Sequence, residues 1–252
     1  MSNSSLVRYT KISPNKTSPR NHKIDTISIH CAVGQLTAKQ ILNMSHFVTY
    51  DSKKGSSCNY AIGHDGSIGM GVEEKDRSWC TSSRSNDHRA ITIEVASDTK
   101  HPYTVTDKAY KALISLLTDI CKRNGIKELK WEGDKSLIGK PEKQNMTVHR
   151  WFANKDCPGD YMYERHGQIA AEVNEMLNGK KAVDSDEYKV KVTINNLNIR
   201  KGPGINYART GKFTGKGVFT IVKESKGSGS SKGWGKLKSG AGWISLDYTT
   251  KV

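Results

Sequence analysis

The sequence predicts a mixed α/β domain, with a central β-sheet flanked by helices, followed by a small all-β barrel. Strand-like and helix-like segments alternate as far as residue 177, which is typical of a sheet covered by helices. From residue 188 onward, short β-branched runs are separated by glycines. A helical pattern ends just before, and a short polar stretch follows it. We therefore place the domains at 1–177 and 188–252, with a linker at 178–187.

The strands of the first domain are marked by β-branched residues and by a turn. Residues 26–31 and 90–96 contain the isoleucine, threonine and valine runs expected of central strands. Residues 59–64 and 67–70 are apolar runs joined by an Asp-Gly dipeptide, which favours a tight turn. These four segments predict a sheet that includes a hairpin.

Three helices are predicted in the same domain. The first spans 37–47, with Thr37 near its N-cap. The second follows Thr106 as its N-cap, repeats apolar residues at helical spacing and stops at an Asn-Gly pair. The last spans 159–177, after a short strand that ends at His149.

The barrel is predicted from five short strands. The segment 226–233 combines glycine, serine and lysine, which predicts a flexible, solvated loop within the barrel. The five strands are predicted at 189–194, 197–200, 218–222, 234–237 and 242–244.

The composition is that of a polar protein without a membrane segment. Hydrophobic residues make up 35% of the 252 residues, and the mean hydropathy is −0.64. No apolar run approaches the ~18 residues that cross a bilayer, and the N-terminus lacks the pattern of a secretory signal. We expect a monomer made in the cytoplasm without a signal peptide and without membrane insertion. Five cysteines in an irregular pattern predict free thiols instead of a disulfide framework.

The formal charge of +15 predicts an anionic partner. Nucleic acid, a membrane surface and a phosphate-rich Gram-positive wall all have this property. Residues 185–252 carry 13 lysines and arginines against 4 acidic residues, a net +9, so the smaller part is the more basic. No zinc-finger pair, helix-turn-helix or aromatic RNA-binding motif is present, so nucleic acid is not expected as a partner.

The densest chemical signal lies between His149 and Cys157. These two residues are separated by seven others, and Pro158-Gly159 follows the cysteine. Imidazole and thiolate are ligands that zinc prefers. His30 supplies a third ligand from another strand, where alternation points its side chain away from those of its neighbours. Single histidines on strands are more often structural, but three such ligands predict a zinc site with the fourth position open to water.

Several separated motifs occur in the order found in one enzyme family. They are the strand ending in His30, the hairpin with Asn59 and Tyr60, the strand 91–94, and the segment from His149 to Cys157 that contains Lys155. In these motifs the chain resembles the zinc-dependent N-acetylmuramoyl-L-alanine amidases, which are related to phage lysozyme-type amidases and to peptidoglycan recognition proteins. The resemblance covers roughly residues 20–177.

This resemblance implies a metal ion and a set of catalytic residues. It implies Zn²⁺ ligands at His30, His149 and Cys157, and catalytic residues at Glu94, Lys155 and Tyr60. Lys155 would stabilise the oxyanion, the Tyr60 hydroxyl would hydrogen-bond the attacking water or the intermediate, and Glu94 would carry the proton. The alternatives are a buried structural acid, a core tyrosine and a surface lysine. Whether Glu94 or Tyr60 handles the proton stays open.

One position departs from the family pattern. Relatives often have a Trp-His pair at the edge of the substrate groove, where this chain has Trp79-Cys80. The departure concerns the stem-peptide preference and leaves the three zinc ligands unaffected. Cys31 and Cys121 are expected in the core, with the Cys31 side chain on the other side of its strand from the ligand beside it.

The C-terminal residues resemble bacterial SH3-type domains over 188–252. The similarity rests on the Leu-Asn-Ile-Arg-Lys-Gly-Pro-Gly segment at 197–204 and on the closing Gly-Trp-Ile run at 242–244. Such domains in wall hydrolases bind peptidoglycan, so the resemblance implies a targeting role. The aromatic residues expected to line a groove or fill the core are Tyr207, Trp234, Trp243 and Tyr248, with Trp243 assigned to the core.

Together these features predict a hydrolase that cleaves the amide bond between N-acetylmuramic acid and L-alanine of the stem peptide. The expected partners are peptidoglycan and the anionic polymers of a Gram-positive wall. The two-part layout without a signal favours a phage or prophage endolysin that acts at the wall after release. A host autolysin and a non-catalytic peptidoglycan-binding protein are the alternatives, and the retained Cys157 favours an enzyme.

Overall fold

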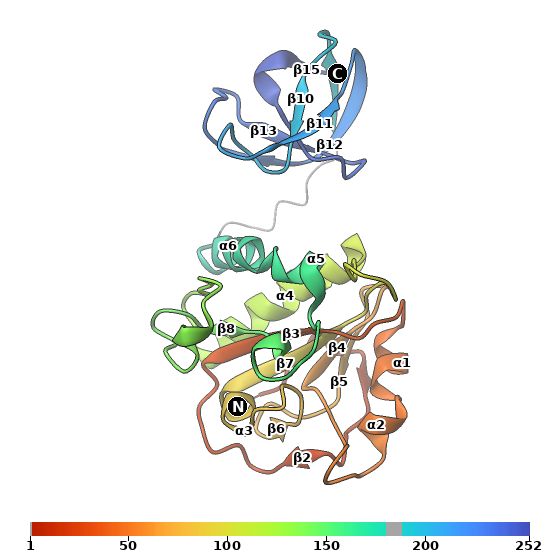
Figure 1. The fold of residues 1–252 in the computed structure, drawn as a ribbon, viewed down its shortest axis with the longest axis vertical. Helices are drawn as coiled ribbons and strands as arrows, with labels where there is room; N and C mark the ends of the chain where they lie inside the picture. Colours follow the sequence, from red (N-terminus) through yellow and green to blue (C-terminus); the bar gives the residue numbers. More distant parts are fainter. Residues whose placement is uncertain (1, 180–187) are drawn as a thin grey trace. The chain divides into compact units, whose positions relative to one another are not determined.

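A computed structural model describes residues 2–179 and 188–252 of the chain. The chain divides into two compact units, Met1–Lys180 and Lys181–Val252 (Figure 1). Most of the predicted linker, at 180–187, lies outside the described residues. None of the helices in the described ranges has the length and apolar character that a membrane crossing requires.

A six-stranded mixed sheet forms the centre of the first unit, as the sequence predicts. Its strand order is β1-β5-β4-β7-β3-β8, and β3 pairs in parallel with both β7 and β8. The strands are β1 (Tyr9–Thr10), β3 (Thr26–Cys31), β4 (Tyr60–Ile62), β5 (Ile68–Met70), β7 (Ala90–Val95) and β8 (Met146–Thr147). A separate two-stranded sheet pairs β2 (Lys16–Thr17) with β6 (Arg77–Ser78).

Helices cover both faces of this sheet. α4 (Asp107–Asn124) and α6 (His166–Leu177) pack on one face, where their apolar residues join the main core (Figure 1). α1 (Ala38–Leu42) belongs to a smaller cluster that includes Ala61 of β4. The remaining helical segments are α2 (Ser45–Val48), α3 (Arg84–Arg89), α5 (Gly159–Tyr163) and the 3-10 turns η1 (Lys135–Leu137) and η2 (His149–Trp151).

Two helices begin at their predicted caps. The Thr37 hydroxyl accepts a hydrogen bond from the Gln40 amide while the Gln40 side chain accepts one from the Thr37 amide, which is a capping box at the start of α1. Thr106 caps α4, and Gly125 ends that helix with a φ of 69°. The left-handed conformation at this position explains the predicted stop.

Two other predicted helices are each divided in the structure. Residues 37–47 form α1 and part of α2, because the chain leaves the helical conformation at Asn43. Residues 159–177 form α5 and α6, which are separated by Glu164 and Arg165.

Alternation along the strands separates two rows of side chains. Ile29, Ile93 and Tyr60 are neighbours across β3, β7 and β4, and all three lie in the core with α4. His30 pairs with Glu94 in the next row. Successive residues of a strand point to opposite faces, so His30 and Glu94 face away from α4.

The second unit is an antiparallel all-β structure, as predicted. Its strand order is β11-β10-β14-β13-β12-β9-β15. The strands are β9 (Tyr188–Val192), β10 (Asn198–Arg200), β11 (Arg209–Phe213), β12 (Gly217–Ser225), β13 (Trp234–Leu237), β14 (Trp243–Ser245) and β15 (Thr249–Lys251), and a 3-10 turn, η3 (Leu246–Tyr248), precedes β15. β11 and β15 were not among the predicted strands, because their side chains are mostly exposed and lack an apolar alternation.

Candidate active site

Three residues that are distant in the sequence, His30, His149 and Cys157, lie together in the first unit. Their ligand atoms are all within 4.8 Å of one another. His30 Nδ1 lies 3.4 Å from Cys157 Sγ, and the centroids of the two imidazole rings are 5.1 Å apart. The structure thus brings together the three side chains for which the sequence predicts a shared metal ion.

Neighbouring parallel strands position these side chains. His30 lies near the end of β3 and is buried. His149 follows β8, the parallel neighbour of β3, and begins η2 instead of ending the strand. The loop that carries Cys157 returns to this point because the Arg150 amide donates to the Cys157 carbonyl at 3.0 Å. Parallel strand ends and one backbone hydrogen bond therefore bring the three side chains together.

A serine hydroxyl lies at the second ring nitrogen of each histidine. Ser28 Oγ is 3.2 Å from His30 Nε2, and Ser82 Oγ is 3.1 Å from His149 Nε2. Ser82 adopts a φ of 63°, which is rare for a residue other than glycine. Such contacts fix the orientation of a ligating ring. Neither serine carried a sequence signal, because their roles depend on contacts between distant segments.

The protonation states of the three residues suit metal binding. Burial, together with the His149 and His166 rings, lowers the pKa of His30 well below 6.5, and burial with the nearby Lys155 lowers the pKa of His149. Both imidazoles are therefore neutral at pH 7 and offer a lone pair. The Cys31 thiol and burial raise the pKa of the Cys157 thiol, so a bound cation would replace its proton.

Cys31 lies closer to this site than the sequence indicates. It is buried, as expected, but its backbone amide donates to Cys157 Sγ at 3.5 Å. The expected burial of Cys31 is confirmed, and the last residue of β3 also adjoins the cysteine loop through its backbone.

Glu94 is the carboxylate of this site. Its Oε1 atom lies 3.9 Å from His30 Nδ1 and accepts a hydrogen bond from the Cys80 thiol at 3.9 Å. Its Oε2 atom is buried and has no hydrogen-bond partner among the described residues. Burial raises the pKa of Glu94 to about 7. A buried carboxylate with an unpaired oxygen is more typical of a reactive group than of a structural one.

Tyr60 does not reach this site, in contrast to its predicted role. Its side chain lies in the core row on the α4 face, and its hydroxyl donates to Glu74 Oε1 at 2.6 Å. The Tyr60 hydroxyl oxygen also accepts a hydrogen bond from the Ser4 amide at 3.0 Å. The β4 register places Tyr60 beside Ile93 and not beside Glu94, so the core alternative describes this tyrosine.

Lys155 lies on the exposed loop between the two ligands His149 and Cys157. Its amide donates to the Ala153 carbonyl at 2.9 Å, which turns the loop. Its positive charge is close enough to lower the pKa of His149. Lys155 is thus an exposed positive charge beside His149.

A family model for N-acetylmuramoyl-L-alanine amidases, Amidase_2, matches residues 20–160. The chain belongs to this amidase family. It is therefore a peptidoglycan amidase, a hydrolase of amide bonds in the bacterial wall. The match includes all of the candidate site and ends before α6 and the second unit.

Several solved structures resemble the amidase at low sequence identity. The endolysin LysCS from Clostridium intestinale URNW is 17% identical, with 68% of this chain and 99% of that chain covered and a TM-score of 0.44. PlyL is 14% identical, with 66% and 94% covered and a TM-score of 0.46. The peptidoglycan recognition protein SD of Drosophila is 17% identical, with 63% and 88% covered and a TM-score of 0.47. Among curated proteins, none matches the amidase.

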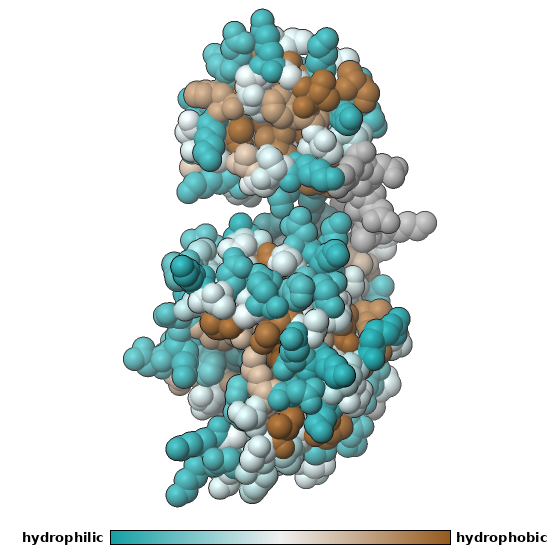
Figure 2. All heavy atoms as spheres, turned by 90° about the vertical axis from the view of Figure 1, so that its right-hand side faces the viewer, coloured by the Kyte–Doolittle hydropathy of each residue, from teal (hydrophilic) through white to brown (hydrophobic). Residues whose placement is uncertain are grey.

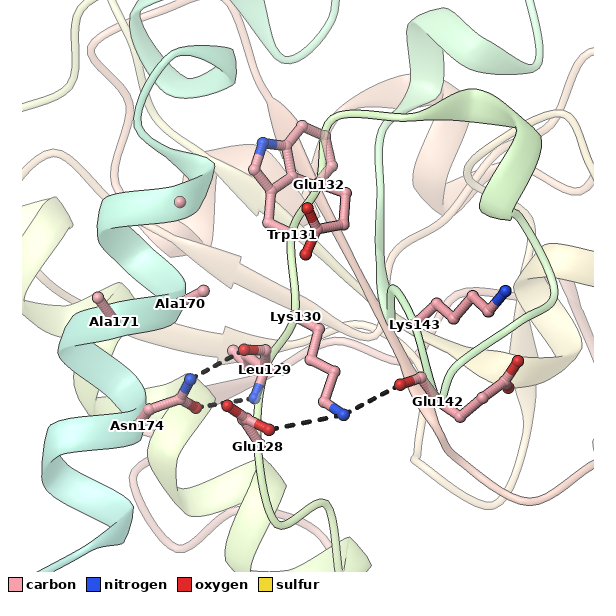
Figure 3. A pocket seen from close by; sticks show the side chains of 11 residues that line it. Glu128, Leu129, Lys130, Trp131, Glu132, Glu142, Lys143, Ala170, Ala171 and Asn174 are labelled. Carbon is pink, nitrogen blue, oxygen red and sulfur yellow. Dashed lines mark hydrogen bonds and ion pairs between the residues drawn. The ribbon is translucent and has the colours of Figure 1, made fainter.

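A pocket of about 550 Å³ lies elsewhere on the amidase domain, between α6 and the segment 128–132 (Figure 3). One lysine of its lining is bonded within the pocket: Lys130 Nζ lies 3.6 Å from Glu128 Oε2 and donates to the Glu142 carbonyl at 3.0 Å. Asn174 of α6 bonds both the amide and the carbonyl of Leu129. This pocket contains no group of metal ligands, so we place the chemistry at the His30 site.

Proposed function

We propose that the amidase depends on zinc, held by His30, His149 and Cys157. The convergence of these three side chains within 4.8 Å is the observation that carries the proposal. Two neutral imidazoles and one thiol form a donor set that suits zinc better than magnesium or calcium. When bound, the ion supplies a Lewis acid that polarises the scissile carbonyl and makes hydroxide available near neutral pH.

We further propose how the residues around these ligands act in hydrolysis. The bond cleaved is the amide between the lactyl group of N-acetylmuramic acid and L-alanine. The Glu94 carboxylate accepts a proton from the attacking water and passes it to the leaving amine of L-alanine. Lys155 stabilises the negative charge that develops on the carbonyl oxygen. Tyr60 is not part of this set, because its hydroxyl is held by Glu74 in the core.

Digestion of defined muropeptides, followed by mass analysis, tests the bond and the metal together. We expect products with free muramic acid carboxylate and a free L-alanine amine. A strong chelator should abolish the cleavage, and added Zn²⁺ should restore it. Cleavage within the glycan or between stem amino acids would overturn the bond assignment. Full activity of the metal-free protein would overturn the role of zinc.

We propose that the second unit binds the bacterial wall through an SH3-type domain. Its net charge of +9 over residues 185–252 supports attraction to anionic polymers. Tyr207 and Tyr248 are 44% and 55% exposed, whereas Trp234 and Trp243 are buried. A cavity of about 140 Å³ is lined by Arg200, Trp234 and Tyr248 among others. Figure 2 shows hydrophobic residues gathered among hydrophilic ones on one side of this unit.

An amidase joined to a wall-binding unit suits an endolysin, and we propose that role. The wall-binding unit would hold the amidase domain on an insoluble substrate and raise its local concentration. Adding the purified protein to intact Gram-positive cells and to their isolated walls tests the proposal. We expect turbidity to fall in both suspensions. An enzyme that cleaves soluble muropeptides but leaves isolated walls intact would contradict a lytic role.

A further inference from the structure

A second group of ligand atoms adjoins the first. His30, Cys80 and Glu94 also have one ligand atom each within 4.8 Å of one another. The group overlaps the proposed zinc site only at His30. Cys80 follows Trp79 in the sequence and places a thiol beside the Glu94 carboxylate.

The distances show that the two groups share one ring nitrogen. His30 Nδ1 lies 3.4 Å from Cys157 Sγ and 3.9 Å from Glu94 Oε1. Cys80 Sγ lies 3.9 Å from the same glutamate oxygen. The other ring nitrogen, His30 Nε2, is next to Ser28 Oγ. Because a nitrogen lone pair binds one cation, the two groups can hold an ion only in turn.

Cys80 and Glu94 are held in place by the surrounding fold. The Cys80 amide donates to the buried carboxylate of Asp87 at 3.0 Å, and Glu94 is fixed by the pairing of β7 with β3. The Cys80 side chain is buried, and Glu94 Oε2 is an unpaired buried oxygen in the described part of the chain. A bound cation would pair with the Glu94 Oε2 atom, which accepts no hydrogen bond from any described residue.

We propose that His30, Cys80 and Glu94 form a second, alternative position for a thiophilic divalent ion, Zn²⁺ or Cd²⁺. Nitrogen, sulfur and carboxylate oxygen suit these ions, whereas Mg²⁺ and Ca²⁺ require mainly oxygen. Binding releases the Cys80 thiol proton to solvent and leaves the carboxylate as a ligand. An ion at this position is bound by the Glu94 carboxylate, which then cannot transfer a proton during hydrolysis. The enzyme with its ion at the second position is therefore inactive.

The proposal rests on the proposed zinc site, because both metal positions use His30. A variant that lacks the Cys157 thiol distinguishes the second position from the zinc site. Cys157→Ser removes the first-position thiolate and leaves the second group intact. We expect this variant to bind about one equivalent of Cd²⁺ and to show a thiolate-to-cadmium absorption band in the ultraviolet. The double variant C157S/C80S should lose the band. The matched control C157S/C121S, which changes a thiol in α4, should keep it.

Each outcome decides the proposal. Absence of the band in folded C157S, or its persistence in C157S/C80S, overturns the second position. Neither result affects the zinc dependence of the wild-type enzyme, which the chelator experiment measures separately. If circular dichroism shows that C157S is unfolded, Cys157→Ala replaces it. The band of C157A should then be lost in C157A/C80S, and an unchanged band would overturn the proposal.

Discussion

Glu94 shows at the scale of one residue how a sheet presents a reactive group. Its neighbour Ile93 is buried in the core, while Glu94 faces His30 across β7 and β3. We expect Glu94→Gln to lower kcat by about 10²–10⁴-fold while the zinc content stays at one equivalent, because an amide cannot carry the proton. Turnover of a muropeptide and metal analysis of the same sample check this. Normal turnover would remove Glu94 from the mechanism, and Glu128→Gln at an exposed position is the control.

For Tyr60 we predict the opposite outcome, a loss of stability with little change in turnover. Tyr60→Phe removes the hydrogen bond to Glu74 and the acceptor of the Ser4 amide, both of which are buried. We expect the free energy of unfolding to fall by about 1.5–3 kcal/mol, as for a buried hydrogen bond to a charged group. Turnover of the folded variant should remain close to that of the wild type. Urea unfolding and kcat measure the two effects, and a stable variant with greatly reduced turnover would show that the tyrosine acts in catalysis.

The grouping of His30, His149 and Cys157 could be predicted from the sequence, whereas the position of Tyr60 could not. His149 and Cys157 are close in the chain, so their residue types and spacing carry the signal. The face occupied by Tyr60 depends on the strand register, and a shift of one residue exchanges the two faces. Ser28 and Ser82 contact the two histidines only after β3 and the segment before α3 have folded against them.

At the scale of elements, α4 packs on the face of the sheet that is opposite to His30 and Glu94. Its N-cap Thr106 accepts a hydrogen bond from the Ala109 amide. We expect Thr106→Ala to lower the free energy of unfolding by about 0.5–2 kcal/mol, as for other lost caps. Ser115→Ala, at an exposed position of the same helix, is the control and should have little effect. Equal effects of the two substitutions in thermal or urea unfolding would contradict the capping role.

The first residue of α6 makes stability depend on pH. His166 is fully buried, and its Nδ1 atom donates to the Met162 carbonyl at 2.7 Å. Burial lowers the pKa of His166 to about 4. Between about pH 6.5 and pH 4 the unfolded state binds a proton that the folded state does not, so stability falls as the pH decreases through this range. The full effect is about 3 kcal/mol, and it is absent above pH 7.

His166→Phe isolates this contribution. The variant should lose stability at pH 7, because the hydrogen bond to Met162 is gone, but should show a weaker decline toward pH 4 than the wild type. Urea unfolding of both proteins at pH 7, 5.5 and 4.5 gives the difference, in which contributions from groups that do not interact with His166 cancel. The same pH dependence in both proteins would show that His166 is protonated in the folded state.

Element boundaries were predicted where a local signal sets them, as at Thr37, Thr106 and Gly125. The segment 226–233 illustrates the opposite case. Its glycines and serines predict a flexible loop, but the Asp247 carboxylate accepts hydrogen bonds from the amides of residues 231 and 232 at 3.0 and 2.8 Å. These bonds join positions about fifteen residues apart, which no local pattern reveals.

At the scale of the whole molecule, charge is concentrated in the second unit. We expect the double variant K212E/K216E to bind purified Gram-positive walls more weakly than the wild type, most clearly at low salt. Both lysines are exposed, and the change removes two positive charges and adds two negative ones, so the net charge falls by four. The matched control K135E/K140E makes the same change in the first unit and should retain wall binding. Sedimentation with walls over a range of salt concentrations compares them, and equal losses would mean that net charge alone determines binding.

The two rows of side chains in β3 and β7 also affect how such an enzyme can evolve. Ile29 and Ile93 support folding, whereas His30 and Glu94, one position further along, belong to the site. A change at one position therefore leaves the neighbouring function largely intact, although the two residues share a peptide bond. Natural selection can modify the chemistry of this sheet without first rebuilding its interior.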